Sequence, residues 1–192
     1  MPKSATIGLV LALLLVASCS KPTPKEYAYP AWGFAATFPD KPKTTETPGA
    51  ADGSRPPSFL AHASQPGGYD FAVNVADASN ATTTKDEMLD AAPQAMADSL
   101  QLDVGAITDA KLGTREGKQV RFDKGGKPVM LMRMFFAYQK FYEVSATIPK
   151  GLGDPVSLSF LNSFHLTSHF GGGGAPGGAA PANAAAAANA AS

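Results

Sequence analysis

Cysteine is almost absent from this chain of 192 residues, which contains Cys19 and no other cysteine. One cysteine cannot form a disulfide within the chain, so the fold must depend on its hydrophobic core. Long apolar runs are missing too. The run at residues 7–16 has 10 residues, whereas a helix that spans a bilayer needs about 20. We therefore expect the N-terminal apolar segment to be removed instead of retained as a membrane helix.

Recognisable catalytic machinery is also lacking. The sequence has no Gly-x-Ser-x-Gly nucleophile elbow, no glycine-rich phosphate loop and no paired-cysteine metal knuckle. Basic and acidic residues balance at 16 each, so no excess of positive charge is available to attract nucleic acid. We expect a protein that is not an enzyme, carries no cofactor and does not bind nucleic acid.

The first 18 residues follow the order of a bacterial export signal. Lys3 provides a positive start, the apolar run follows, and small residues precede Cys19. The sequence "VASC" at 16–19 resembles the lipobox of bacterial lipoproteins, in which a peptidase cuts before a cysteine that carries lipid. Ordinary cleavage with an idle thiol, or an apolar N-terminus within a soluble core, are the alternatives. The order of features favours lipid attachment at Cys19, and Ser20 in place of aspartate is typical of similar lipoproteins in the outer membrane.

Composition predicts one folded domain between two ends of low complexity. We expect a signal peptide at residues 1–18, a lipidated cysteine and extended tether at 19–28, a folded domain at 29–168 and a disordered tail at 169–192. From residue 171 onward the tail has no charged, aromatic or long aliphatic side chain, so it cannot offset its ordering entropy by apolar burial. An inert spacer is favoured for it over an arm that binds a partner.

Alternating and continuous apolar segments predict several strands in the central part of the chain. The hairpin at 58–77 should place Phe71, Val73 and Val75 on one face. A second helix should begin at Asp154 with Pro155 in its first turn. The expected strands lie at residues 33–38, 58–64, 69–77, 105–112, 117–123, 128–138 and 140–149.

The first helix is expected from Thr84 onward. Thr84 and Glu87 have the spacing of a capping box. Four apolar residues recur at a helical spacing of four, which predicts a stripe that faces the core. The stripe consists of Met88, Ala92, Met96 and Leu100. Pro93 interrupts the pattern, so we expect a kink or a restart of the helix there.

Four segments of the chain resemble the PsbP-like fold: "YPAWGFAATFPDKPK", "GTREGKQVRF", "MFFAYQKFYEVSATIP" and "FLNSFHL". The resemblance covers residues 29–166. Proteins of this fold include the PsbP subunit of photosystem II, a nuclear-transport factor that binds Ran, and small bacterial envelope proteins. The resemblance implies an α+β fold with a central antiparallel sheet flanked by helices on both faces. Because the members share no common activity, it assigns no functional residues.

Two groups of residues raise the possibility of a metal site. His165 and His169 are four residues apart, and His62 could supply a third ligand. The Met-x-Met-x-Met series at 130–134 is typical of soft ligands for monovalent copper. A buried strand requires the same spacing of two, and methionine packs well in irregular cores. Ordinary surface histidines and core methionines are the favoured interpretation.

Charge is distributed unevenly along the chain. Residues 111–140 contain eight basic and two acidic residues, a difference of +6, whereas residues 84–103 contain one basic and five acidic residues, a difference of −4. Such a patch could attract an acidic protein or anionic lipid headgroups, but a solvated face that keeps the strands soluble is the more ordinary explanation. The candidate contact residues are Arg115, Lys118, Arg121, Lys124 and Lys127.

These features together favour a lipid-anchored, non-catalytic binding or accessory module of the bacterial cell envelope, on the periplasmic side of the outer membrane. The alternative is an envelope enzyme or copper carrier whose site is assembled from residues scattered along the sequence. A pocket with convergent polar groups would favour the alternative.

Overall fold

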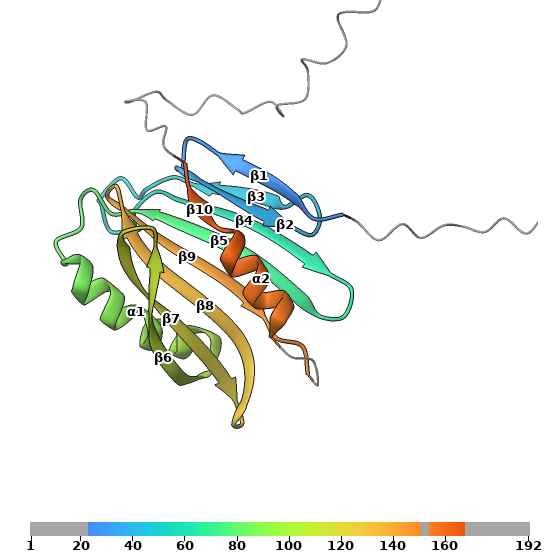
Figure 1. Cartoon of the computed structure of the whole chain (residues 1–192). Coiled ribbons are helices and arrows are strands. Elements are labelled where there is room, and N and C mark those ends of the chain that lie inside the picture. The colour runs from blue at the N-terminus through green and yellow to red at the C-terminus, as the bar shows by residue number, and fades with distance from the viewer. Residues whose placement is uncertain (1–22, 151–153, 168–192) are drawn as a thin grey trace, which may run out of the picture.

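The computed structural model describes residues 23–150 and 154–167, which form two sheets and two helices (Figure 1). The expected signal peptide, Cys19 and the expected tail lie outside the described residues. The strands are β1 (Lys25–Tyr29), β2 (Phe34–Phe38), β3 (Lys43–Thr47), β4 (Ser58–Gln65), β5 (Tyr69–Asp77), β6 (Asp103–Leu112), β7 (Arg115–Lys124), β8 (Lys127–Ala137), β9 (Lys140–Thr147) and β10 (His165–Leu166). The helices are α1 (Lys85–Leu100) and α2 (Pro155–Ser163).

The larger sheet has seven antiparallel strands in the order β3-β4-β5-β9-β8-β7-β6. Short turns join β4 to β5, β6 to β7, β7 to β8 and β8 to β9. The β7–β8 turn uses Gly125 and Gly126 at φ 57° and 72°, a region that glycine enters without steric cost. The pairing of β5 with β9 closes the sheet between distant parts of the chain. The hairpin predicted at residues 58–77 is confirmed, and Phe71, Val73 and Val75 are all buried.

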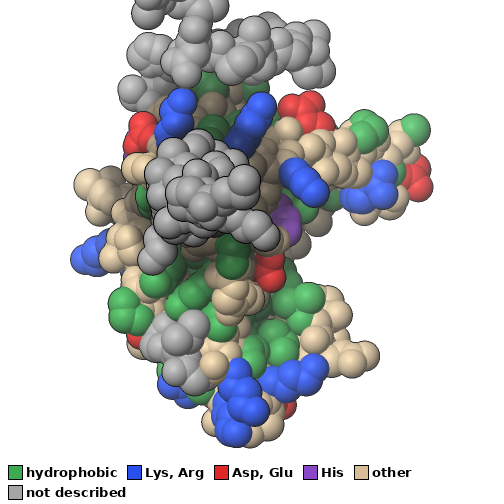
Figure 2. All heavy atoms as spheres, turned by 90° about the vertical axis from the view of Figure 1, so that its right-hand side faces the viewer, with side chains coloured by type: hydrophobic (Ala, Val, Ile, Leu, Met, Phe, Trp, Pro, Cys, Tyr) green, Lys and Arg blue, Asp and Glu red, His purple; other side chains and the backbone are tan. Residues whose placement is uncertain are grey.

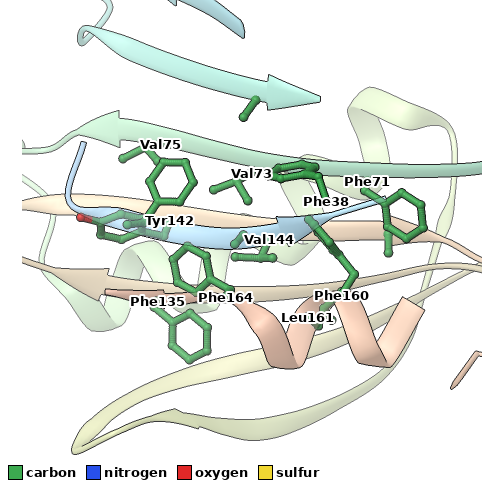
Figure 3. Close-up of a cluster of buried hydrophobic side chains, with 14 of the residues drawn as sticks. Phe38, Phe71, Val73, Val75, Phe135, Tyr142, Val144, Phe160, Leu161 and Phe164 are labelled. Carbon is green, nitrogen blue, oxygen red and sulfur yellow. The ribbon is translucent and has the colours of Figure 1, made fainter. Parts of the chain in front are cut away.

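The smaller sheet, in the order β1-β2-β10, packs with α2 over one face of the larger sheet. Figure 3 shows how side chains from α2 point toward those of the larger sheet. The Phe38 and Phe160 rings are 5.1 Å apart, and those of Phe34 and Phe164 are 5.7 Å apart. Tyr142, which is fully buried, donates its hydroxyl hydrogen to the Trp32 carbonyl at 3.0 Å. Aromatic burial on this scale is a major source of stability.

Helix α1 packs on β6, β7 and β8 and buries a second apolar cluster. The capping box of Thr84 and Glu87 is present as predicted, and the helix continues through Pro93. The predicted core stripe is shifted by one residue, because the buried side chains are Leu89, Pro93 and Ala97. The residues predicted for the stripe are only partly buried, and Leu100 is 46% exposed. α1 therefore has more apolar surface than the sheet beneath it covers.

The expected α+β layout, a central sheet flanked by helices on both faces, is wrong. Strands account for 51% of the described residues, and they form two sheets with only two short helices. The smaller sheet was not expected, because β1 is mostly exposed and β10 has only two residues. The strand β3, at the edge of the larger sheet, also lacks apolar alternation. β1 and β3 read "KEYAY" and "KTTET" and are mostly exposed. Backbone pairing at a sheet edge holds β3, and in β1 it acts together with the packing of Tyr27 and Tyr29 on the core.

Strand β1 lies partly within the segment 19–28. It begins at Lys25 and pairs with β2 from Lys25↔Phe38 to Tyr29↔Phe34. A strand thus occupies part of the segment for which an extended tether was expected. Only four residues, 21–24, separate Ser20 from this strand.

Candidate binding groove

A groove of about 690 Å³ lies between α1 and the loop that joins β3 to β4. Ala76 at the end of β5 and Phe141 at the start of β9 also line it. Most of the side chains that form its walls are small or apolar. They include Met88, Ala91, Ala92 and Ala95 from α1 and Ala50, Pro56 and Pro57 from the loop.

The apolar wall of the groove follows from the way α1 sits on the sheet. Leu89, Pro93 and Ala97 face the sheet and are buried. Residues one or two positions before these lie on the adjacent helix face, which is directed into the groove. Ala91 and Ala95 are exposed there. The sequence signal was present, since α1 has two neighbouring apolar stripes, but only one stripe was expected and it was assigned to the core.

Two carboxylates at the rim of the groove accept hydrogen bonds from neighbouring residues of the chain. The Glu87 carboxylate accepts hydrogen bonds from the Thr84 backbone N–H and hydroxyl, both at 2.9 Å. These bonds stabilise the charged form and lower the pKa of Glu87. Asp77 accepts from the Ser79 backbone N–H at 2.9 Å. The groove therefore has an apolar surface with hydrogen-bonded carboxylates at its rim.

The five candidate basic residues lie along β7 and the β7–β8 turn, but three of them already have partners. The Arg121 guanidinium forms two hydrogen bonds with Asp123, at 3.0 and 3.1 Å. Lys118 lies 3.4 Å from Asp109, and the Arg115 guanidinium carbon lies 4.3 Å from the centre of the Tyr138 ring. These contacts pair three of the five cationic side chains with groups of the protein itself, so less of their charge is available to a partner.

Strand geometry also divides the basic residues between two faces of the sheet. Val120 and Phe122 of β7 pack under α1, so Lys118 lies on the same face as these residues. Arg115 and Arg121 lie on the opposite face. Lys124 pairs with Lys127 across the turn. The structure thus does not bring the five residues together as one continuous patch.

A group that was not expected from the sequence, His62, Ser64 and Asp70, lies at the β4–β5 hairpin. The Ser64 hydroxyl donates to Asp70 Oδ1 at 2.5 Å, and His62 Nε2 lies 3.3 Å from the same oxygen. Ser64 Oγ is 3.5 Å from that same Nε2. In a Ser-His-Asp triad the serine and aspartate contact different ring nitrogens. Here both approach Nε2, so the group has the composition of a triad without its geometry.

A half-buried carboxyl lies farther along the same face as Ala76 and Phe141. Glu143 on β9 pairs with Asn74 on β5, and the Asn74 amide donates to Glu143 Oε2 at 2.6 Å. Burial raises the pKa of Glu143, although the hydrogen bond from Asn74 opposes the shift. This pair was not expected from the sequence, because only the register of β5 against β9 brings its two residues together.

The residues considered as metal ligands have separate environments. Met130, Met132 and Met134 are 8%, 3% and 0% exposed and pack beneath α1, which confirms the interpretation as core residues. His165 lies 3.9 Å from Glu26, His62 is on β4, and His169 falls outside the described residues. Within residues 23–150 and 154–167, no three His, Cys, Asp or Glu side chains form a group that could hold a metal ion.

Neither α1 nor α2, the helices of the described part of the chain, is long and apolar enough to span a membrane. Comparisons by sequence gave no match to any family model or to any curated protein.

Comparison with solved structures identifies the fold. The solution structure of cyanobacterial PsbP (CyanoP) from Synechocystis sp. PCC 6803 matches with a TM-score of 0.55 at 11% identity, over 78% of this chain and 95% of that chain. This likeness supports the expected PsbP-like fold, and at this identity it concerns the fold alone.

Two other solved structures are more distant. A protein from Bacteroides thetaiotaomicron VPI-5482 has a TM-score of 0.41 at 19% identity, with 74% of this chain and 48% of that chain covered. A protein of unknown function from Pseudomonas aeruginosa, PA94, described as a putative regulator, has a TM-score of 0.35 at 12% identity, with 66% and 83% covered.

Proposed function

We propose that this protein is a lipid-anchored, non-catalytic binding module of the bacterial cell envelope that holds a partner in the groove beside α1. Two features support the proposal. The sequence at residues 16–19 resembles a lipobox, and the likeness to the fold of cyanobacterial PsbP is compatible with an accessory, non-catalytic module. In this proposal Cys19 fixes the protein to the periplasmic side of the outer membrane.

The groove is the observation that carries the binding role. Its volume of about 690 Å³ lies within the range of ligand sites, about 300–1,000 Å³. Ala91 and Ala95 are exposed in it although they contribute nothing to the buried face of α1. Partner side chains that cover this surface would remove apolar area from water, which is favourable in proportion to the area buried.

Filling the groove tests this role. The variant Ala95→Phe should block the groove without disturbing the core, because Ala95 is exposed. A photo-crosslinking residue at position 91 should capture a defined partner in cells, and Ala95→Phe should abolish that capture. Gln94→Phe is the matched control, since Gln94 is exposed on the same helix but does not line the groove.

The control should retain the crosslink, and both phenylalanine variants should unfold at the parent's denaturant concentration. Equal capture by the parent and Ala95→Phe would contradict a binding role for the groove. Turnover of a substrate by the purified protein, lost on a single polar substitution, would favour the enzyme alternative instead.

The anchor is tested separately at Cys19. Cys19→Ser removes the thiol that would carry lipid, so incorporation of labelled palmitate should be lost and the protein should no longer partition with membranes. A variant that partitions like the parent would contradict lipid anchoring. This result would leave the groove as a possible site of a protein without an anchor.

A further inference from the structure

Several turns and strand ends lie at one end of the larger sheet, the end near which the described residues begin. The Ile148 backbone N–H donates to the Val129 carbonyl at 2.8 Å, which joins the end of β9 to the start of β8. Thr147 donates its hydroxyl hydrogen to the Gly68 carbonyl at 3.0 Å, which joins β9 to the β4–β5 turn. We call this region the anchor end. It comprises residues 23–25, the β4–β5 and β7–β8 turns and the start of α2, along the right and lower edge of Figure 1.

The anchor end has an apolar hollow of about 530 Å³. Pro24, Pro155 and Val156 surround it, and Phe71 and Phe160 lie deeper inside. Val156 is 43% exposed, although apolar side chains of this size are usually buried. The hollow thus joins the segment that leads to Cys19 with the uncharged helix α2.

Three lysines lie at the same end of the strands as this hollow, on other connections. Lys124 and Lys127 flank the β7–β8 turn, and Lys150 follows the end of β9; all three are exposed. None of them takes part in an ion pair with another of the described residues. Figure 2 views this side of the molecule and shows apolar side chains with basic ones below them, at the level of the β7–β8 turn. Apolar contact flanked by lysines is the combination that binds an anionic bilayer surface.

The distance to Cys19 determines which surface the anchor end faces. Thr23, the first described residue, is four positions after Cys19, and four residues span at most about 14 Å when fully extended. A compact domain of this size is about 35–40 Å across. If Cys19 carries lipid, the start of β1 and the hollow beside Pro24 must therefore lie near the bilayer, and the groove beside α1 opens at the opposite end of the strands.

We propose that the anchor end docks on the surface of the lipid bilayer, with Val156 against the headgroup region and Lys124 and Lys127 on anionic headgroups. This inference rests on the lipid anchor of the proposed function. Docking orients the domain so that the groove beside α1 faces away from the membrane, where a partner can reach it.

Site-specific fluorescence tests the docking. Because Cys19 is the only cysteine, a chain with that thiol acylated allows one new cysteine to be labelled selectively. The acylated full chain carrying Val156→Cys is labelled with a polarity-sensitive dye and placed in vesicles of phosphatidylethanolamine and phosphatidylglycerol that contain a lipid-borne quencher. Ile107→Cys is the matched control, since Ile107 on β6 is 49% exposed and Val156 is 43% exposed.

We expect the dye at 156 to be quenched more strongly than the dye at 107. The double variant Lys124→Glu and Lys127→Glu should lose this preference, since each lysine near an anionic surface changes the docking equilibrium by about fivefold. The double variant Lys85→Glu and Lys111→Glu removes two exposed lysines elsewhere and should keep it. Membrane partition should be equal in all variants, because the lipid remains.

The outcomes separate docking from anchoring. Acylation at Cys19 with equal quenching at 156 and 107 would overturn the docking and leave the anchor intact. If the chain proves not to be acylated, the dye is attached in a Cys19→Ser background, and stronger quenching at 156 there would keep the docking surface and overturn the anchor. If the emission of the dye at 156 changes only after an envelope protein is added, this surface binds a protein partner, and the lipid proposal is overturned.

Discussion

Glu143 links stability to pH at the scale of a single side chain. Burial raises the pKa of this carboxyl above its usual value. The folded state therefore favours the protonated form more than the unfolded state does, so the stabilising contribution is present at acidic pH. It is lost as the pH rises from the usual carboxyl pKa through the raised one.

Glu143→Gln should therefore increase the free energy of unfolding at neutral pH. The glutamine carbonyl can still accept the hydrogen bond from the Asn74 amide, which is 2.6 Å long in the parent. The gain should disappear at a pH below the usual carboxyl pKa, where Glu143 is protonated in both states. Denaturation by urea at several pH values measures this. A gain that is the same at every pH would show that the ionisation of Glu143 is not its cause.

Gly117 shows how close the strands β7 and β8 are to each other. A Cβ atom at this position would collide with the Met134 carbonyl oxygen and the Phe135 ring. Gly117→Ala should therefore destabilise the fold by about 1–3 kcal/mol through overpacking, as measured by denaturant unfolding. The control is Ala110→Gly, because Ala110 pairs with Gly117 across β6 and β7. It should cost only about 0.5–1 kcal/mol, and equal costs would contradict the steric explanation.

At the scale of elements, the sequence predicted those strands whose side chains alternate. Phe71, Val73 and Val75 are apolar at every second position, and they point into the core as expected. β3 has no such pattern, and in β1 Tyr27 and Tyr29 alternate but are only partly buried. Backbone hydrogen bonds to the neighbouring strand help to hold both edge strands. The composition of a strand does not show which other strand its backbone groups pair with. For this reason the second sheet could not be predicted.

The candidate groove was missed for a related reason. The apolar residues of α1 were visible in the sequence, but Leu89 and Met88 are neighbours on adjacent faces of the helix. Which face meets the sheet depends on the packing against β6, β7 and β8. The basic residues were correctly placed near a turn, yet strand alternation separates Lys118 from Arg121 by putting them on opposite faces.

The start of α1 depends on its capping box, which also fixes one side of the groove. Thr84 accepts a hydrogen bond from the Glu87 backbone N–H at 3.3 Å. Thr84→Ala should lower the free energy of unfolding by about 1 kcal/mol, as loss of an N-cap does elsewhere. Thr82→Ala, at an exposed position just before the cap, is the control and should have no effect. Equal unfolding midpoints in urea for both variants would contradict the importance of the cap.

At the scale of the whole molecule, β8 connects the two apolar clusters. Met130, Met132 and Met134 belong to the cluster beneath α1, whereas Leu131 and Phe135 belong to the one beneath the smaller sheet and α2. The two clusters thus occupy opposite faces of one strand. Loss of β8 from the sheet would expose both clusters, so we expect them to unfold together.

Two probes on opposite sides of the sheet test this cooperativity. Trp32, the only tryptophan, stacks on Phe59 at 5.5 Å and reports on the cluster beneath the smaller sheet. A dye attached through Asp90→Cys, in a Cys19→Ser background, reports on α1. Both signals should change at the same denaturant concentration if unfolding is two-state.

Phe135 is 2% exposed and belongs to the cluster that contains no residue of α1. Phe135→Ala should nevertheless shift both transitions equally. The cavity it leaves should cost about 3–5 kcal/mol. A shift of the Trp32 transition alone would show that the two clusters unfold as separate units. Equal shifts would show that the two clusters unfold as one cooperative unit, as expected of a domain in which contact of one end with a membrane orients a groove at the other.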